Sequence, residues 1–288
     1  MTNLIAAPKY LRIFRVSLIE RLAYRGDFLL GTLLRFLPMV TTILLWRAVY
    51  QGTGHGEDAE LAGYNYHEMI AYLLLVHISR MFSSMPGLAS GVARDIRDGS
   101  LKKYLIQPLD MIGYLTAYRA AHKVAYIVTS ALPYAAIFGL FSRYFDHLPD
   151  GPTLVAYVAS LLLGFVVGFH FEVCIGMIGF WLLEVSSLMY VVMTVNYFVS
   201  GHMFPIDLLP SSHIEWGWIN VSINWAGILK ALPMQYLAYF PAAVFLGKVQ
   251  GPDLWYGLGG EVAWAIALVF LSRVLYRTGL RRYSAFGG

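Results

Sequence analysis

The sequence predicts an all-α integral membrane protein with six transmembrane helices. Of its 288 residues, 58% are hydrophobic and 13% are charged, whereas a soluble domain carries about 25% charged residues. Aromatic residues make up 15% of the chain, which suits belts of tyrosine and tryptophan at both membrane interfaces. We expect residues 1–288 to form one transmembrane domain. Its six predicted spans are 28–50, 64–84, 111–141, 153–183, 185–204 and 258–276.

Residues 1–27 precede the first span and are too polar to cross a membrane. Their apolar residues recur at helical spacing: Leu11, Phe14, Leu18 and Leu22. Their basic residues include Arg12, Arg15, Arg21 and Arg25. A basic amphipathic helix lies in the plane of the lipid headgroups, and we expect this one to do so; packing on a protein partner is the alternative. The segment lacks the apolar core and cleavage site of a signal peptide, so no removable leader is expected.

Most charged residues within the spans lie near span ends, where long side chains reach the interface. We place Glu68, Arg80 and Glu261 in this group. The third span has a basic first third, so its apolar part is expected to begin near Val124. The fourth span has glycines at 164 and 168, then at 176 and 179, a spacing that favours close helix packing.

His170 and Glu172 differ, because they lie near the middle of the fourth span. An ionisable group at that depth costs a few kcal/mol, so it should face the helix bundle or a water-filled path. The polar residues Asn196, Tyr197 and Ser200 of the fifth span could line the same path. Hydrogen bonding between helices, with no role beyond packing, is the alternative for both sets.

Residues 205–256 separate the fifth and last spans. They contain several prolines, and their apolar runs are about 10–14 residues long, too short to cross a membrane. One such run is 236–246. We therefore predict short interfacial or re-entrant helices at one face of the membrane.

Residues 94–108, RDIRDGSLKKYLIQP, form a charged run between the second and third spans. Gly99-Ser100 is a good helix start, and Pro108 would end the helix. The expected apolar face consists of Leu101, Tyr104 and Leu105, at positions i, i+3 and i+4. Such a helix suits docking into a groove of a soluble partner. A solvated loop resting on anionic headgroups is the alternative.

Basic residues set the orientation. They gather in the N-terminal helix, in 94–108 and after the last span, whereas the other loops are mostly acidic. The positive-inside rule therefore places both termini and 94–108 in the cytoplasm.

The chain contains no GxxxxGK[ST] nucleotide-binding loop, no residue pattern that identifies a catalytic site and no metal-ligand cluster. Its single cysteine, Cys174, lies in an apolar stretch. Three classes of function remain open. The first is a transport subunit that takes its energy from a partner, and the second is a membrane-embedded lipid-modifying enzyme. The third, a secondary transporter, would show matching halves, which we do not see.

Four features, in order along the chain, resemble permeases of the ABC-2 family, in particular a bacterial branch of unassigned substrate. The first is the basic N-terminal helix. The second is similar to the family's coupling segment and consists of Asp98, Gly99, Leu101, Leu105 and Pro108. The third is a pair of short helices in LPMQYLAYFPAAVFLGK, and the fourth is the ending GLRRYSAFGG.

The resemblance implies the permease subunit of an ATP-driven exporter in the bacterial cytoplasmic membrane, moving a hydrophobic, lipid-like or drug-like substrate. It implies a dimer with a second copy or a paralogue, contacts with membrane lipids and no nucleic acid. Cytoplasmic ABC ATPase subunits would bind ATP and Mg, so this chain would hold no cofactor. The implied ATPase-coupling residues are Asp98, Gly99, Leu101, Tyr104, Leu105 and Pro108.

Overall fold

The computed structural model describes residues 6–23, 25–54, 56–145, 148–182, 185–216 and 219–283. The first elements are α1 (Ala6–Ala23), α2 (Arg25–Gly52), η1 (Gly56–Asp58), α3 (Tyr66–Ser83), α4 (Leu88–Arg97), α5 (Lys102–Leu105), α6 (Met111–Leu140) and η2 (Ser142–Tyr144). The remaining elements are α7 (Gly151–Met177), η3 (Ile178–Phe180), α8 (Ser186–Val199), η4 (Ile206–Leu208), β1 (Ser211–Trp216), β2 (Ile219–Asn224), α9 (Trp225–Lys230), η5 (Pro233–Leu237), α10 (Tyr239–Phe245) and α11 (Gly251–Leu280). The last five residues of the expected C-terminal motif, 284–288, lie outside the described residues.

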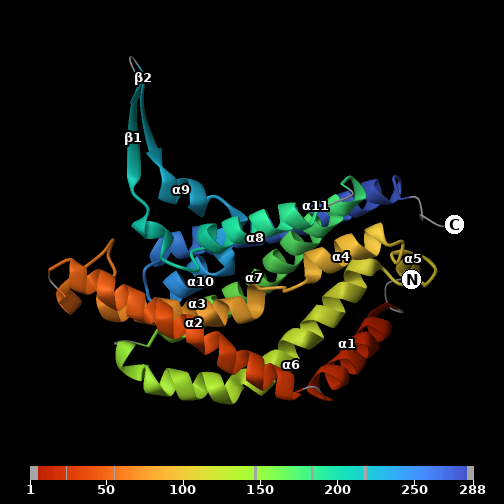
Figure 1. The fold of residues 1–288 in the computed structure, drawn as a ribbon, viewed down its shortest axis with the longest axis horizontal. Helices are drawn as coiled ribbons and strands as arrows, with labels where there is room; N and C mark the ends of the chain where they lie inside the picture. The colour runs from red at the N-terminus through yellow and green to blue at the C-terminus, as the bar shows by residue number, and fades with distance from the viewer. Residues whose placement is uncertain are drawn as a thin grey trace.

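Helix α7 is the centre of the helical body, because it packs against α3, α4, α10 and α11. Figure 1 shows α8 and α11 along one side of the molecule and α2 and α6 along the opposite side. Helix α5 and the C-terminal end of α11 lie at one end of the body. The hairpin β1–β2 projects from the other end (Figure 1).

Within the residues that the structure describes, four helical stretches have the length and apolar composition needed to cross a membrane: Tyr66–Arg97, Met111–Leu140, Gly151–Phe180 and Gly251–Leu280. They correspond to the second, third, fourth and sixth predicted spans. Helix α2 covers the first predicted span, 28–50. Helix α8 has only 14 residues, so the fifth predicted span ends as a helix at Val199 rather than near 204.

The second predicted span does not end at residue 84 but breaks and continues. Ser84–Gly87 separates α3 from α4, and Gly87 has a φ of 72°. A proline at 86 supplies no amide donor, and glycine adopts the positive φ without steric cost. The break leaves backbone carbonyls at the end of α3 that need donors from elsewhere.

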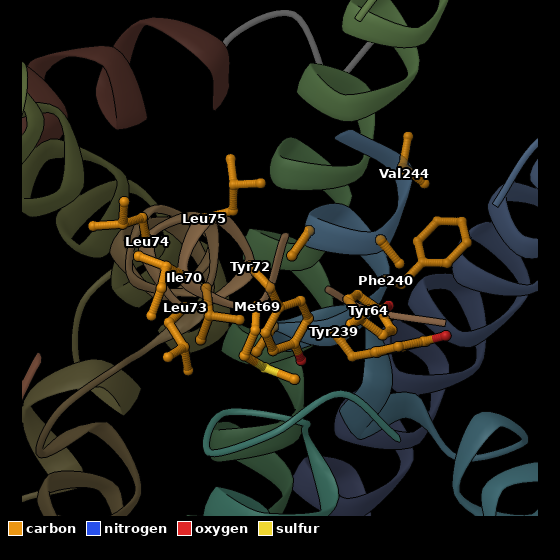
Figure 2. Close-up of a cluster of buried hydrophobic side chains, with 14 of the residues drawn as sticks. Tyr64, Met69, Ile70, Tyr72, Leu73, Leu74, Leu75, Tyr239, Phe240 and Val244 are labelled. Carbon is orange, nitrogen blue, oxygen red and sulfur yellow. The ribbon is translucent and has the colours of Figure 1, made fainter. Parts of the chain in front are cut away.

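The buried core nearest the hairpin end is rich in tyrosine. Figure 2 shows the rings of Tyr64, Tyr72 and Tyr239 close together between α3 and α10. The hydroxyl of Tyr72 donates to the carbonyl of Gly201, and that of Tyr50 donates to the carbonyl of Tyr64 at 2.7 Å. Each buried hydroxyl therefore holds a loop against this core.

The region 205–256 contains the expected short helices, η5 and α10, but also a hairpin that we did not expect. Strands β1 and β2 pair antiparallel, with Ser211 opposite Asn224 and Trp216 opposite Ile219. Residues 219–224 alternate apolar and polar side chains, INVSIN, which is the period of a strand. The expectation of helices alone was wrong here, because this alternation was overlooked.

A capping box begins α3. Asn65 Oδ1 accepts from the Glu68 amide at 2.8 Å, and Glu68 Oε2 accepts from the Asn65 amide at 3.0 Å. Replacing Asn65 by Ala should lower the free energy of unfolding by about 1 kcal/mol, because buried α3 loses an N-cap. Thermal unfolding of the detergent-solubilised protein measures this loss.

Asn224→Ala is the matched control. Asn224 caps α9 in the same way, accepting from the Gly227 amide at 2.9 Å. None of the residues of α9 is buried, so losing this cap should leave the global unfolding midpoint unchanged. Equal effects of the two changes would contradict the assignment of α3 to the core.

Candidate functional site

The segment 94–108 is a helix end, a tight turn and one further helical turn. Helix α4 ends at Arg97, and Gly99 turns the chain with a φ of 72°. The amide of Leu101 then donates to the carbonyl of Asp95 at 2.8 Å. The expected Ser100 cap was wrong, because the residue preceding α5 is Leu101 and no side chain caps this helix.

The expected apolar face of this segment divides between the interior and the surface. Leu101 is 0% exposed and Tyr104 is 8% exposed. Both pack in a cluster with Ile96 and Val173, so the expectation that they face a partner was wrong for this structure. The reason is that α4, α6 and α7 already present an apolar surface beside α5, and burying two large side chains there stabilises the turn.

The exposed part of the segment 94–108 begins directly after Tyr104. Leu105 is 46% exposed and Ile106 is 81% exposed. Lys103 forms an ion pair with Asp95 at 2.7 Å; although burial opposes it, this hydrogen bond raises the pKa of Lys103. Asp98 lies 3.1 Å from Arg97 Nε. The tip of the segment is therefore an apolar pair beside exposed Lys102.

Polar contacts tie the chain around Pro108 to the N-terminal helix and to α11. Lys9 Nζ donates to the Pro108 carbonyl at 2.7 Å. Asp110 Oδ2 accepts from the Gly113 amide at 2.7 Å and so caps α6. Its other oxygen, Oδ1, lies 2.5 Å from Arg273 Nη1 of α11. The sequence analysis missed Asp110, although Asp directly before an apolar run is typical of an N-cap.

Helix α1 lies along α6, with Phe14 and Leu18 half-buried and Leu11 and Leu22 exposed. Arg21 donates to the Tyr118 hydroxyl and lies over its ring. Arg12 and Arg15 are exposed, and the side chain of Arg25 lies outside the described residues. The apolar side chains expected on one face of α1 are thus divided between half-buried positions beside α6 and exposed positions.

Glycines bring the backbones of α4 and α7 into direct contact. A Cβ atom at Gly176 would lie 2.7 Å from the Ala89 carbonyl oxygen, and one at Gly179, in η3 directly after α7, would lie 3.2 Å from Ala93 Cα. A Cβ at Gly168 would collide with the Ser83 carbonyl. The expected glycine packing face is therefore confirmed.

His170 and Glu172 face different neighbours, and the structure does not bring them together. His170 Nδ1 and Ser272 Oγ of α11 are 2.9 Å apart. Glu172 Oε2 accepts from the Ala89 amide at the start of α4, at 3.4 Å. Each side chain therefore satisfies a contact between α7 and another helix, which is the packing alternative.

The polar residues expected to line a path together with His170 and Glu172 lie in α8 and directly after it. Ser200 is fully buried, and Tyr197 is partly exposed. Asn196 Oδ1 is buried and has no hydrogen-bond partner among the described residues. The ring of Tyr197 packs against His202, with centroids 4.3 Å apart, so this group lies apart from the contacts of His170.

Two basic residues of α6 supply donors to the α3–α4 break. Lys123 Nζ donates to the carbonyls of Met81, at 2.7 Å, and Ser84. Arg119 Nη1 donates to the Pro86 carbonyl at 3.0 Å. From the sequence, both residues belong to the basic first third of the third span. Their spacing of four residues, which places them on one face of α6, was the signal for a shared partner.

Glu261 was expected at the membrane interface, and this was wrong. It is 0% exposed in α11 and faces α7, where a Cβ at Gly164 would lie 3.9 Å from its Oε1 atom. Neither carboxyl oxygen has a hydrogen-bond partner among the described residues. Position along a span gives depth but does not say whether a side chain faces lipid or another helix.

At the hairpin end, a cavity of about 550 Å³ is lined by Tyr64, Tyr239, Asp207 and Lys230, among others. Asp207 Oδ1 lies 2.5 Å from Lys230 Nζ, and its Oδ2 accepts from the Tyr239 hydroxyl at 2.7 Å. The ion pair therefore ties α9 to the tyrosine-rich core.

A family model described as ABC-2 family transporter protein matches residues 36–287. The match extends from the middle of α2 into the C-terminal tail, so it includes the segment 94–108 and the helices around the α3–α4 break. No curated protein matches the chain.

Replacing Lys123 by Met should lower the free energy of unfolding by about 1–3 kcal/mol, because two carbonyls at the end of α3 lose their donor. The thermal unfolding midpoint in detergent measures this change. Lys102→Met is the control, since Lys102 is exposed and its replacement should leave the midpoint unchanged. Indistinguishable midpoints for Lys123→Met and the unmodified protein would show that these hydrogen bonds do not support the break.

Proposed function

The chain belongs to the ABC-2 family of transporter proteins, and we propose that it is the membrane subunit of an ATP-driven exporter. Separate cytoplasmic ATPase subunits would bind ATP and Mg and supply the energy. The observation that carries this proposal is the exposed apolar pair at the tip of 94–108, Leu105 and Ile106. Exposed apolar side chains beside a lysine at a helix turn suit a groove on a soluble partner.

We infer that the chain crosses the bacterial cytoplasmic membrane six times. Four stretches have the required length and composition, and α2, with 28 residues, is long enough. Helix α8 is about 21 Å long at 1.5 Å per residue, so the segment 200–208 would complete the fifth crossing. The basic residues at the end bearing α5 favour a cytoplasmic position for that end and for both termini.

The proposed coupling site differs from the first expectation in the roles of its residues. Leu105 and Ile106, flanked by Lys102, would contact the ATPase. Leu101 and Tyr104 would anchor the turn in the protein's own core instead. Asp98, Gly99 and Pro108 shape the turn, and the Lys9 contact holds the Pro108 carbonyl.

A force on α5 would reach the membrane helices through two routes. The first is the apolar cluster around Leu101, which includes residues of α4, α6 and α7. The second is the backbone contact of α4 with α7 at Gly176 and with η3 at Gly179. Packed interiors transmit displacement because they are dense and hard to compress, so we propose that α4, α5 and α7 move together.

A second permease, either a copy of this chain or a paralogue, would pack on α8. Only Met189 of this helix is buried. Its exposed apolar residues include Tyr190, Val191, Val195 and Phe198. A helix of a second permease could cover this face, as lipid could.

Ile106→Asp and Leu105→Asp should each weaken binding of the ATPase at least about tenfold, because a charge would have to enter an apolar groove. Co-purification with the co-expressed ATPase, followed by titration of the purified subunits, measures this. ATP hydrolysis stimulated by the permease should fall in parallel.

Leu148→Asp is the matched control. Leu148 is 80% exposed, as open as Ile106, but it lies in the connection between α6 and α7. This variant should bind the ATPase normally. Normal binding by the Ile106 and Leu105 variants as well would refute the coupling site.

A further inference from the structure

A cavity of about 310 Å³ lies beside the α3–α4 break. Its walls come from α2, α3, α6 and α8 and from the segment that follows α8. The polar residues that line it include His77, Arg80, Tyr197 and His202. None of its lining residues is acidic, and an arginine and two histidines line the same chamber.

Further basic side chains lie next to the chamber. Ser84 and Pro86 line it, and their carbonyls accept from Lys123 and Arg119. Glu172, whose charge acts on Arg119 and Arg80, supplies a single carboxyl group. These basic groups would attract an anion bound in the chamber.

The chamber also offers donors already in position. The rings of His77 and His202 meet edge to face with centroids 5.7 Å apart. His202 Nδ1 is buried and has no hydrogen-bond partner within the part of the chain that the structure describes. A buried polar atom of this kind costs free energy until it is paired, so a bound acceptor would stabilise it.

We propose that this chamber binds the anionic headgroup, a phosphate or carboxylate, of a single-chain or double-chain amphiphile. Its apolar chain would lie against exposed residues of α2 and α8, such as Leu37 and Phe198. The claim that this amphiphile is the exported cargo depends on the proposed function. The claim that the chamber binds it does not depend on that function. The chamber would select against cationic amphiphiles because Arg80 repels them.

The test uses the full chain purified in dodecyl maltoside, with radiolabelled oleoyl lysophosphatidic acid as the probe. Its affinity should exceed that of oleoyl lysophosphatidylcholine, which has the same chain but a zwitterionic headgroup, by about tenfold. Inorganic phosphate should compete only weakly, because it lacks the chain. Equal affinities for the two lipids would overturn the proposal. Displacement by phosphate as effective as by the lipid would overturn its amphiphile part.

Variants assign the binding to this chamber. Arg80→Gln and His202→Gln should each weaken binding of lysophosphatidic acid about tenfold, whereas Arg80→Lys should restore most of it. Arg47→Gln is the control, since Arg47 is an exposed residue of α2. Unchanged binding by monodisperse His202→Gln and Arg80→Gln proteins would overturn the proposal, as would an equal loss in Arg47→Gln.

This assay contains no ATPase, so its outcome is separate from that of the proposed function. Selective binding that depends on Arg80, together with failure of any ATPase to bind, would retain the chamber and reject the exporter. The reverse result would retain the exporter and reject an anionic headgroup as its ligand.

Discussion

Direct backbone contact between α7 and the α3–α4 segment is the constraint on which the rest of the structure depends. The carbonyl of Ser83 lies where a Cβ at Gly168 would be, and the carbonyl of Ala89 faces Gly176 in the same way. Any side chain at these glycines would push the two segments apart. Helix α11 packs on α7 as well, so the position of α4 is set against the middle of the bundle.

The break between α3 and α4 creates a second requirement. Within a membrane, backbone carbonyls need donors from the protein itself. Lys123 and Arg119 provide them, and Glu172 accepts from the Ala89 amide at the start of α4. The buried charges of this region are therefore explained first by the backbone. The same basic groups lie beside the chamber for which we propose a preference for anions.

Local patterns in the sequence predicted much of the fold. Apolar runs indicated the long helices, the glycine spacing around Gly164 and Gly168 indicated a packing face, and proline-rich 205–256 indicated short helices. Each of these depends on neighbours in the chain, which a single sequence displays. The strand alternation in 219–224 was equally local, and recognising it would have predicted β2.

The candidate site was harder to predict, because it depends on what covers each face. Helical spacing correctly put Leu101 and Tyr104 on one face, but it could not say that this face is buried in an apolar cluster with residues of α4, α6 and α7. Depth along α11 likewise suggested an interfacial Glu261, whereas the facing helix leaves room for it at Gly164. The role of Arg119 as a donor to the Pro86 carbonyl depends on the break between α3 and α4, which the sequence did not predict.

The central claim is that α4 and α7 move as one body when the ATPase acts. A Cβ at Gly179, in η3 directly after α7, would lie 3.3 Å from Ala93 Cβ, slightly less than the roughly 3.5–4.5 Å between the Cβ atoms of a disulfide. In a Cys174→Ala background, the pair Ala93→Cys and Gly179→Cys should cross-link readily on mild oxidation. The account predicts that the cross-linked complex hydrolyses ATP within about twofold of its reduced form, since a rigid contact needs no relative motion. Loss of turnover on cross-linking, restored by reduction, would contradict it.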